Sequence, residues 1–584
     1  MADESQQIRG IHWREAFPFT HLFRAFRIAI HPSKLVLGLI ALLALYAGGR
    51  LLDGLWSARS LAIPSEVYAY QANTTTGGTS DQFTAERQRK RDDIEDAYAT
   101  RLVESGVVKD RAAADAAAKD GDRLSDVKRK ILDRREQRRN EAVSQYNSAR
   151  NGANAIKDPR EHDRALRDAD EAYRTQVRTV YVDAYDDMRS AEQIRGIGLF
   201  HAFFSYEAER INAVIRGVQN WNWLGSARDG REGVVEAVIN FFRIAPIWLM
   251  RHHPLYFVLF TLWFLTVWAI FGGAIARIAA VHVARDEKLS VRAALAFSMG
   301  KFLSFVSAPL IPLVIVLFVG LVPLIAGLLA SIPFIGPILN IVMALLFALI
   351  LAAGFVMTLV MLGTFGGFNL MYPTIAVEGS DSFDAISRSF SYVYARPWRM
   401  LFYTIVAIIY GALCYLFVRL FIWLMLSLTH YFVGAGMFAQ AESLAPLWTT
   451  MWPGPQARGT LSYDIDFLTL RFDQDIAAVL IAFWVYLVVG MLGAFVISFY
   501  FSANTIIYYL MRNEVDATEM DDVYIEQSEE DFTDTTTTPI PTAPASAVVV
   551  ETSASTTTSV VTPSPAAEKV EPPGMPPATE PPAT

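Results

Sequence analysis

The chain has 584 residues, of which 53% are hydrophobic and 19% charged, and its formal net charge is −8 at pH 7. A negative balance without a concentrated basic region argues against nucleic acid as a partner. The single cysteine, Cys414, excludes a disulfide framework and a cysteine-based metal site. Residues 302–377 contain no Asp, Glu, Lys or Arg. Because a helix needs about 20 apolar residues to cross a bilayer, this stretch crosses at least twice, and we predict an all-α, polytopic membrane protein.

Residues 1–33 are predicted to form an amphipathic helix that lies in the membrane interface. Its apolar residues share one sector of the helix, and Arg24 and Arg27 lie opposite, where they can contact lipid head groups. Residues 34–56 then form the first transmembrane helix. The run lacks a signal-peptidase pattern, so we interpret it as a retained anchor.

Residues 57–195 are a very polar block, which we predict to be an extracytoplasmic helical domain. Small and apolar residues recur with an eleven-residue period over 166–188, which favours nearly straight helix packing. Further helices are expected at 82–103 and 123–150. The result is a helical hairpin or small bundle, whose charged faces are either simply solvated or form a coiled-coil docking arm.

The remaining chain divides into three parts. Residues 196–253 are rich in aromatic side chains, which is typical of amphipathic helices at the membrane interface. Residues 254–512 hold about five further spans, and residues 513–584 form an acidic Thr/Pro-rich tail that is predicted to be disordered. The six spans are expected at about 35–56, 254–282, 303–331, 336–373, 399–429 and 476–510.

The fourth span is too long for one straight crossing, because about 38 residues of helix would reach about 57 Å. Either its end projects from the membrane or it breaks near Gly363–Gly367, and whether it crosses once or twice stays open. Lys and Arg concentrate before the first span and in the loops after the second and fourth. This pattern predicts that both termini are cytoplasmic, with 57–253 and 430–475 outside, in a bacterial plasma (inner) membrane.

The segment between the fourth and fifth spans is the most distinctive. Asp381 or Ser382 can cap a short helix with an apolar stripe, and Asp384 and Arg388 lie away from that stripe. We predict an interfacial elbow with Asp381, Asp384 and Arg388 as candidate functional residues. The elbow after the second span is similar, since Ser290 aligns with Ser382, which suggests an internal duplication. The predicted stripe consists of Phe383, Ile386, Phe390 and Val393.

This order of span, acidic turn, elbow and span over about 270–410 resembles the membrane domain found with some bacterial glycerophosphodiester phosphodiesterases and related uncharacterised multipass membrane proteins. The chain lacks the phosphodiesterase barrel of those enzymes. The resemblance therefore implies a membrane bundle and carries over no catalytic residue.

Charged or polar residues inside a membrane often mark a transport path. Arg277 lies near the end of its span, where it can extend to the interface, whereas Arg419 lies deeper and needs a partner such as the Asn340 amide or backbone carbonyls. We recognise no catalytic, cofactor or metal motif. The leading hypothesis is a non-enzymatic envelope scaffold or assembly factor that meets the lipid bilayer and other membrane or envelope proteins through 57–195 and the tail. The alternatives are a transporter or permease-like subunit and, third, a lipid enzyme.

Overall fold

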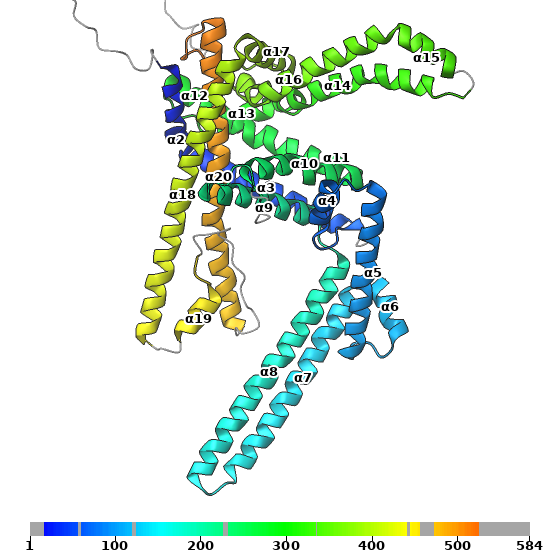
Figure 1. Ribbon diagram of the computed structural model, residues 1–584. Helices are drawn as coiled ribbons and strands as arrows, with labels where there is room; N and C mark the ends of the chain where they lie inside the picture. The colour runs from blue at the N-terminus through cyan, green and yellow to red at the C-terminus, as the bar shows by residue number, and fades with distance from the viewer. Residues whose placement is uncertain are drawn as a thin grey trace, which may run out of the picture. The chain divides into compact units, whose positions relative to one another are not determined.

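The fold is described from a computed structural model of the chain, which describes residues 17–56, 60–119, 124–225, 232–333, 336–440, 444–455 and 472–524. Within these ranges the regular structure is helical, apart from one isolated bridge between Ala62 and Ile197 (Figure 1). The all-α prediction is therefore confirmed. The tail predicted to be disordered over 513–584 begins too early, because residues 513–516 belong to the last helix, Phe472–Asp516. From residue 525 onward the tail lies outside the described residues.

Among the described residues, six helices are long and apolar enough to cross a bilayer, as predicted, so the chain is a multi-pass membrane protein. They are Pro32–Leu55 (α3), Pro254–Arg285 (α11 to α12), Phe302–Ala330 (α14), Phe347–Glu378 (α16), Pro397–Gly436 in α18 and Ile476–Asp516 in α20. The second combines α11 (Pro254–Val267), a π-helical turn η4 (Trp268–Gly272) and α12 (Gly273–Arg285). The full bounds of the last two are Pro397–Gln440 for α18 and Phe472–Asp516 for α20, with α19 (Leu444–Met451) between them.

The fourth apolar segment is interrupted near its start and not at the glycines. Helix α15 (Gly336–Leu345) ends before Leu346, where φ is −92° and ψ is 11°, and α16 (Phe347–Glu378) then runs without interruption. A Cβ atom on Gly363 would lie 2.8 Å from the Phe390 ring of the next helix. The glycine therefore permits close helix packing, and the break that we considered at this position does not occur.

Two short helices follow the second and fourth spans in the same manner. Helix α13 (Val291–Gly300) begins at the N-cap Ser290, whose hydroxyl accepts a hydrogen bond of 3.1 Å from the backbone N–H three residues later. Helix α17 (Ser382–Ala395) begins at Asp381, whose carboxylate accepts the equivalent bond at 2.9 Å. The structure thus aligns Ser290 with Asp381, one residue away from the alignment with Ser382.

This alignment also matches the buried residues of the two elbows. Each helix buries an alanine and, four residues later, a serine: Ala294 and Ser298 in α13, Ala385 and Ser389 in α17. Gly273 of α12 faces Ser298, and Gly367 of α16 faces Ser389. The apolar stripe predicted for α17 is only partly correct, because Phe383 is 68% exposed and Tyr392 takes a place on the buried face.

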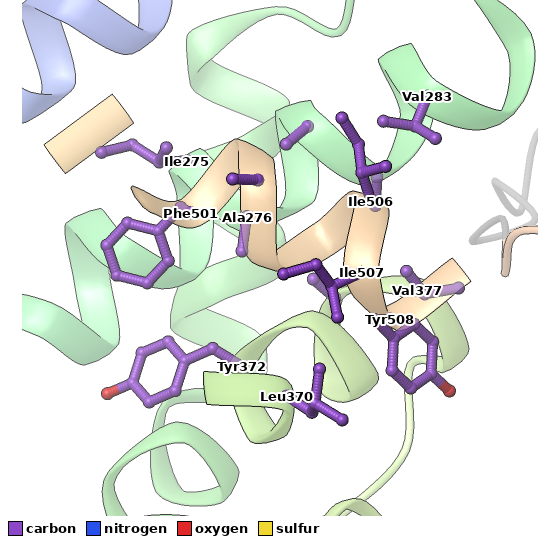
Figure 2. Packing of buried hydrophobic residues seen from close by; sticks show 14 of the residues in the cluster. Ile275, Ala276, Val283, Leu370, Tyr372, Val377, Phe501, Ile506, Ile507 and Tyr508 are labelled. Carbon is purple, nitrogen blue, oxygen red and sulfur yellow. The ribbon is translucent and has the colours of Figure 1, made fainter. Parts of the chain in front are cut away.

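The core of the bundle lies where α12, α16 and α20 meet. Figure 2 shows Ile275 and Ala276 of α12, Leu370 and Tyr372 of α16, and Phe501, Ile506, Ile507 and Tyr508 of α20 packed together. The first helices of the chain, η1 (Pro18–Phe23) and α2 (Arg24–Ala29), also pack on α20. They bury Leu22, Ala25 and Ile28 in this core, so the described part of the N-terminal segment packs on the bundle, and its place in the membrane interface stays a prediction.

The polar block predicted at 57–195 forms helices α4 to α8. Their bounds are Glu66–Thr75 (α4), Ser80–Glu104 (α5), Arg111–Lys119 (α6), Leu124–Asn154 (α7) and Pro159–Arg195 (α8). Helices α7 and α8 pack along each other as a hairpin (Figure 1). The aromatic segment that follows forms α9 (Leu199–Gln219) and α10 (Val234–His252), which pack against each other.

Candidate functional site

The helical arm, residues 63–196, leaves and rejoins the rest of the chain at one point. The Ala62 N–H donates to the Ile197 carbonyl at 3.1 Å, and the Ile197 N–H donates to the Ala62 carbonyl at 2.6 Å. Gly196, at φ +82°, makes the turn into this bridge and would place a Cβ only 2.9 Å from the Ala62 oxygen. The arm is therefore an insertion that is closed at its base.

A buried carboxylate, Glu66, fixes the base of the arm. Its oxygens accept hydrogen bonds from the Ile63 N–H at 2.9 Å and from the Trp248 indole at 3.1 Å. Arg87 Nε lies 3.0 Å and His253 Nε2 lies 3.7 Å from Oε1. Burial alone would raise the pKa of Glu66, but the nearby His253 ring, the charge of Arg87 and the Ile63 N–H hold it below its ordinary value. Helices α4, α5 and α10 are thereby joined through one side chain.

A second carboxylate, Asp53, joins the end of α3 to α9 and α11. It accepts hydrogen bonds from the Phe200 N–H at 2.9 Å and from the Tyr256 hydroxyl at 2.8 Å. The first of these caps α9, whose opening N–H groups have no partner within the helix. Gly198 is required here, because a Cβ would lie 1.9 Å from the Asp53 carboxylate.

Near its base the arm has a small core, and further out it has only two helices. Tyr98, Leu102 and Ile131 belong to the core, which α5 to α8 share. The predicted stripe of α8 over 166–188 is buried or half-buried along α7. Polar contacts link the two helices along their length: Lys128 to Glu192 at 2.8 Å, Arg138 to Asp183 at 3.2 Å, Gln176 to Gln145 at 3.0 Å and Tyr146 to Asp170 at 2.7 Å.

Arg277 is buried among α12, α16 and the chain that follows α20. Its guanidinium donates to the Ala376 carbonyl at 2.8 Å and to the Tyr524 carbonyl at 2.6 Å, and lies 4.3 Å from the Phe297 ring centroid. The Tyr524 N–H in turn donates to the Val377 carbonyl at 2.8 Å. Arg277 therefore holds the chain that follows α20 against the end of α16, which is a structural role.

Two of the candidate elbow residues, Asp384 and Arg388, lie in an ionic network with the end of α20. Arg388 lies 3.1 Å from Asp384 and 3.7 Å from Glu378, and Arg512 lies 2.8 Å from Glu378. Asp381 is used as the N-cap of α17. The network explains why these residue types occur in the elbow, since each charge has an opposite charge beside it.

The other predicted residues are not brought together. Arg419 is buried in α18 and donates to the Tyr415 hydroxyl of its own helix at 3.4 Å. Asn340 is exposed on α15, which packs against α14 and α16, so the expected pairing of Arg419 with this amide is not observed. Arg24 is half-buried and Arg27 exposed on α2, and their contact with lipid head groups stays a prediction.

Comparison with family models, with curated proteins and with solved structures finds no match for this chain. The resemblance to the phosphodiesterase-associated membrane domain accordingly stays an expectation. The side chains that fix the arm, Glu66 and Asp53, were missed from the sequence, because their partners come from distant segments. A carboxylate two residues before the end of an apolar span was the one available signal for Asp53.

Proposed function

We propose that the protein is a non-enzymatic membrane scaffold or assembly factor whose helical arm binds a protein partner. The observation that carries this proposal is the closed and braced base of the arm. The Ala62–Ile197 bridge fixes where the arm leaves the bundle, and Glu66 ties two of its helices to α10. Sites that are built on rigid helices present their side chains more accurately than sites on loops.

The proposed docking surface is the exposed side of the α7–α8 hairpin, from Leu132 and Tyr185 outward to the tip, and residues 139–178 make up most of it. Two helices alone bury little apolar area, and here the fully buried positions include the small residues Ala142 and Ala153. Large apolar side chains remain accessible on the hairpin: Leu132 is 40%, Val182 39% and Tyr185 51% exposed. Tyrosine is enriched where proteins bind each other, because its rigid ring offers a large contact area and a hydroxyl.

We further propose that the arm is extracytoplasmic and that both termini are cytoplasmic, in a bacterial plasma membrane. Asp53, which fixes α9 beside the arm base, lies at the end of α3. At the start of the same helix, His31 contacts His282 near the end of α12 with ring centroids 6.0 Å apart. The basic loop after α12 therefore lies at one end of α3, and the base of the arm lies at the other end. This arrangement agrees with the positive-inside rule if the loop is cytoplasmic and the arm is extracytoplasmic.

The test removes the outer hairpin and keeps the small core of the arm. Residues 139–178 are replaced by a short Gly/Ser turn in the full chain, and a photoreactive amino acid is placed at Tyr185. We expect one defined protein to be cross-linked in native membranes, and we expect the cross-link to disappear in the shortened chain. Unchanged cross-linking after shortening contradicts the docking role.

The transporter alternative is tested in the same material. It requires solute flux in reconstituted vesicles that Arg419→Ala eliminates, whereas the scaffold requires that Arg419→Ala leaves cross-linking at position 185 unchanged. Flux that depends on Arg419, without cross-linking at position 185, selects the transporter.

A further inference from the structure

An apolar groove lies between the aromatic segment and the membrane helices. It has a volume of about 580 Å³ and is lined by residues of α9, α10, α18 and α20 and by Asn369 of α16. Pockets of this size hold drug-sized or single-chain ligands. Ile211, Val214 and Val218 of α9 face Ile408 of α18 and Val496 of α20 across it. Because α18 and α20 are membrane-spanning helices, the groove is accessible to lipid.

A buried carboxyl group without a hydrogen-bond partner lies on α9 one turn before the residues that line the groove. Glu207 is 7% exposed, and both of its carboxyl oxygens are buried without a hydrogen bond. Glu207, Ile211, Val214 and Val218 recur at spacings of four, three and four, so they share one face of α9. The carboxyl group of Glu207 is thus on the same face of α9 as the residues that line the groove, one turn before the first of them.

Arg210, one turn after Glu207, supplies the opposite charge. It lines the groove and is 7% exposed, and its Nε is buried without a hydrogen bond. Its other end is occupied, because a terminal nitrogen pairs with Glu232 and the guanidinium lies 4.8 Å from the Tyr206 ring centroid. An unpaired acceptor and an unpaired donor therefore stand one helical turn apart beside an apolar groove.

Unpaired polar atoms of this kind are costly when buried, so they indicate a ligand that would satisfy them. We propose that the groove holds an acyl chain of a zwitterionic phospholipid, whose ammonium group pairs with Glu207 and whose phosphate accepts a hydrogen bond from Arg210 Nε. The two charges of such a head group match the two unpaired protein groups in sign, and the acyl chain matches the apolar lining. An anionic phospholipid without an ammonium group can offer its phosphate to Arg210 but has no cation for Glu207.

The test measures the thermal unfolding midpoint of the full chain in detergent with added phospholipid. Two lipids with identical dioleoyl chains are compared, one with an ethanolamine and one with a glycerol head group. We expect the ethanolamine lipid to raise the midpoint more than the glycerol lipid. Equal shifts with the two lipids overturn the proposed head-group recognition.

Two matched pairs of variants separate the chain site from the head-group site. Ala412→Trp fills the groove and should abolish the shift with both lipids, whereas Leu413→Trp, on a neighbouring exposed position outside the groove, should retain it. Glu207→Gln should retain the chain effect and lose the preference for ethanolamine. Glu209→Gln, which breaks a surface pair with Arg216, should retain the preference. A full response in Ala412→Trp, or a retained preference in Glu207→Gln, overturns the proposal.

If Ala412→Trp fails to fold, Val496→Trp fills the groove from α20, where the side chain is 45% exposed. Native mass spectrometry gives an independent measurement on the same samples. The wild-type chain should retain one ethanolamine phospholipid that Val496→Trp loses, and retention by the variant contradicts the assignment of the groove.

Discussion

Glu66 and Glu207 are both buried glutamates beside the membrane bundle, but their surroundings differ. Glu66, 1% exposed, has two hydrogen-bond donors and two cationic or titratable neighbours. Glu207, 7% exposed, has no hydrogen-bond partner for either oxygen, and burial raises its pKa to about 8. The comparison teaches that burial alone does not reveal a role. A satisfied carboxylate fastens the arm, and an unsatisfied one beside a groove is available to a ligand.

The largest expected effect comes from breaking the satisfied site. Glu66→Gln leaves the half-buried Arg87 guanidinium without its fully buried carboxylate. Removal of one partner from a buried ion pair costs about 3 kcal/mol or more, and the partial exposure of Arg87 places this pair at the lower end. We expect the free energy of unfolding, measured by chemical denaturation in detergent, to fall by about 3 kcal/mol. Glu86→Gln removes an exposed pair with Lys90 on the same arm and serves as the control. A loss no larger than that of the control would falsify the fastening role.

Glu66 should also affect how the free energy of unfolding falls at acid pH. The pKa of Glu66 is lower in the folded protein than its ordinary value of 4.5. Its contribution is therefore complete above pH 4.5 and is lost as the pH falls through the folded-state value. The wild-type chain should lose stability more steeply below pH 4.5 than Glu66→Gln, and identical acid limbs would contradict this assignment.

The second largest effect has the opposite sign and the opposite dependence on pH. The unfolded chain releases the Glu207 proton near pH 4.5, whereas the folded chain without bound lipid retains it up to about pH 8. An ammonium group bound beside this carboxyl would favour its ionised form. Stability therefore falls as the pH rises between these values. Without added lipid, Glu207→Gln should gain about 2 kcal/mol at pH 8, the usual cost of a buried unsatisfied group, and almost nothing at pH 4.5. A variant that is less stable than wild type at pH 8 would show that Glu207 has a partner in the protein.

Features that depend on local sequence were predictable, and features that depend on distant segments were not. The spans over 302–330 and 347–378 follow from their lack of charge, and the cap at Asp381 follows from residue type and position. Glu66 gave no signal, because Arg87 and Trp248 approach it only in the folded chain.

The break in the fourth apolar segment was misplaced for a physical reason. Glycines both interrupt helices and permit close packing, and sequence does not distinguish these uses. Gly363 and Gly367 serve packing against α17, whereas Leu346 stands at the interruption. Glu207 was overlooked because a glutamate in an amphipathic helix is ordinarily exposed, and only the fold shows that it is enclosed.

A third carboxylate sharpens the comparison, because Asp53 has neutral hydrogen-bond donors in place of cations. Asp53→Asn keeps the side-chain shape but weakens the bonds to the Phe200 N–H and the Tyr256 hydroxyl. We expect a loss of about 1 kcal/mol, typical of an N-cap, in the same denaturation measurement. Asp81→Asn, an exposed position in the first turn of α5, should change stability by less. A loss equal to that of Glu66→Gln would mean that cationic partners add nothing to a buried carboxylate.

The smallest loss of stability is expected for an ion pair at the surface of the arm. Lys128 and Glu192 lie 2.8 Å apart on the arm, with 28% and 65% of their side chains exposed. Because water screens such pairs, Lys128→Met should lower the free energy of unfolding by only about 0.5 kcal/mol. About 0.5 M salt should erase even this difference, since the Debye length is then only a few Å. The loss in Glu66→Gln should persist at the same salt, because its carboxylate is fully enclosed. If the stability loss in Lys128→Met persisted at high salt, burial would not explain the difference between the Lys128–Glu192 and Arg87–Glu66 ion pairs.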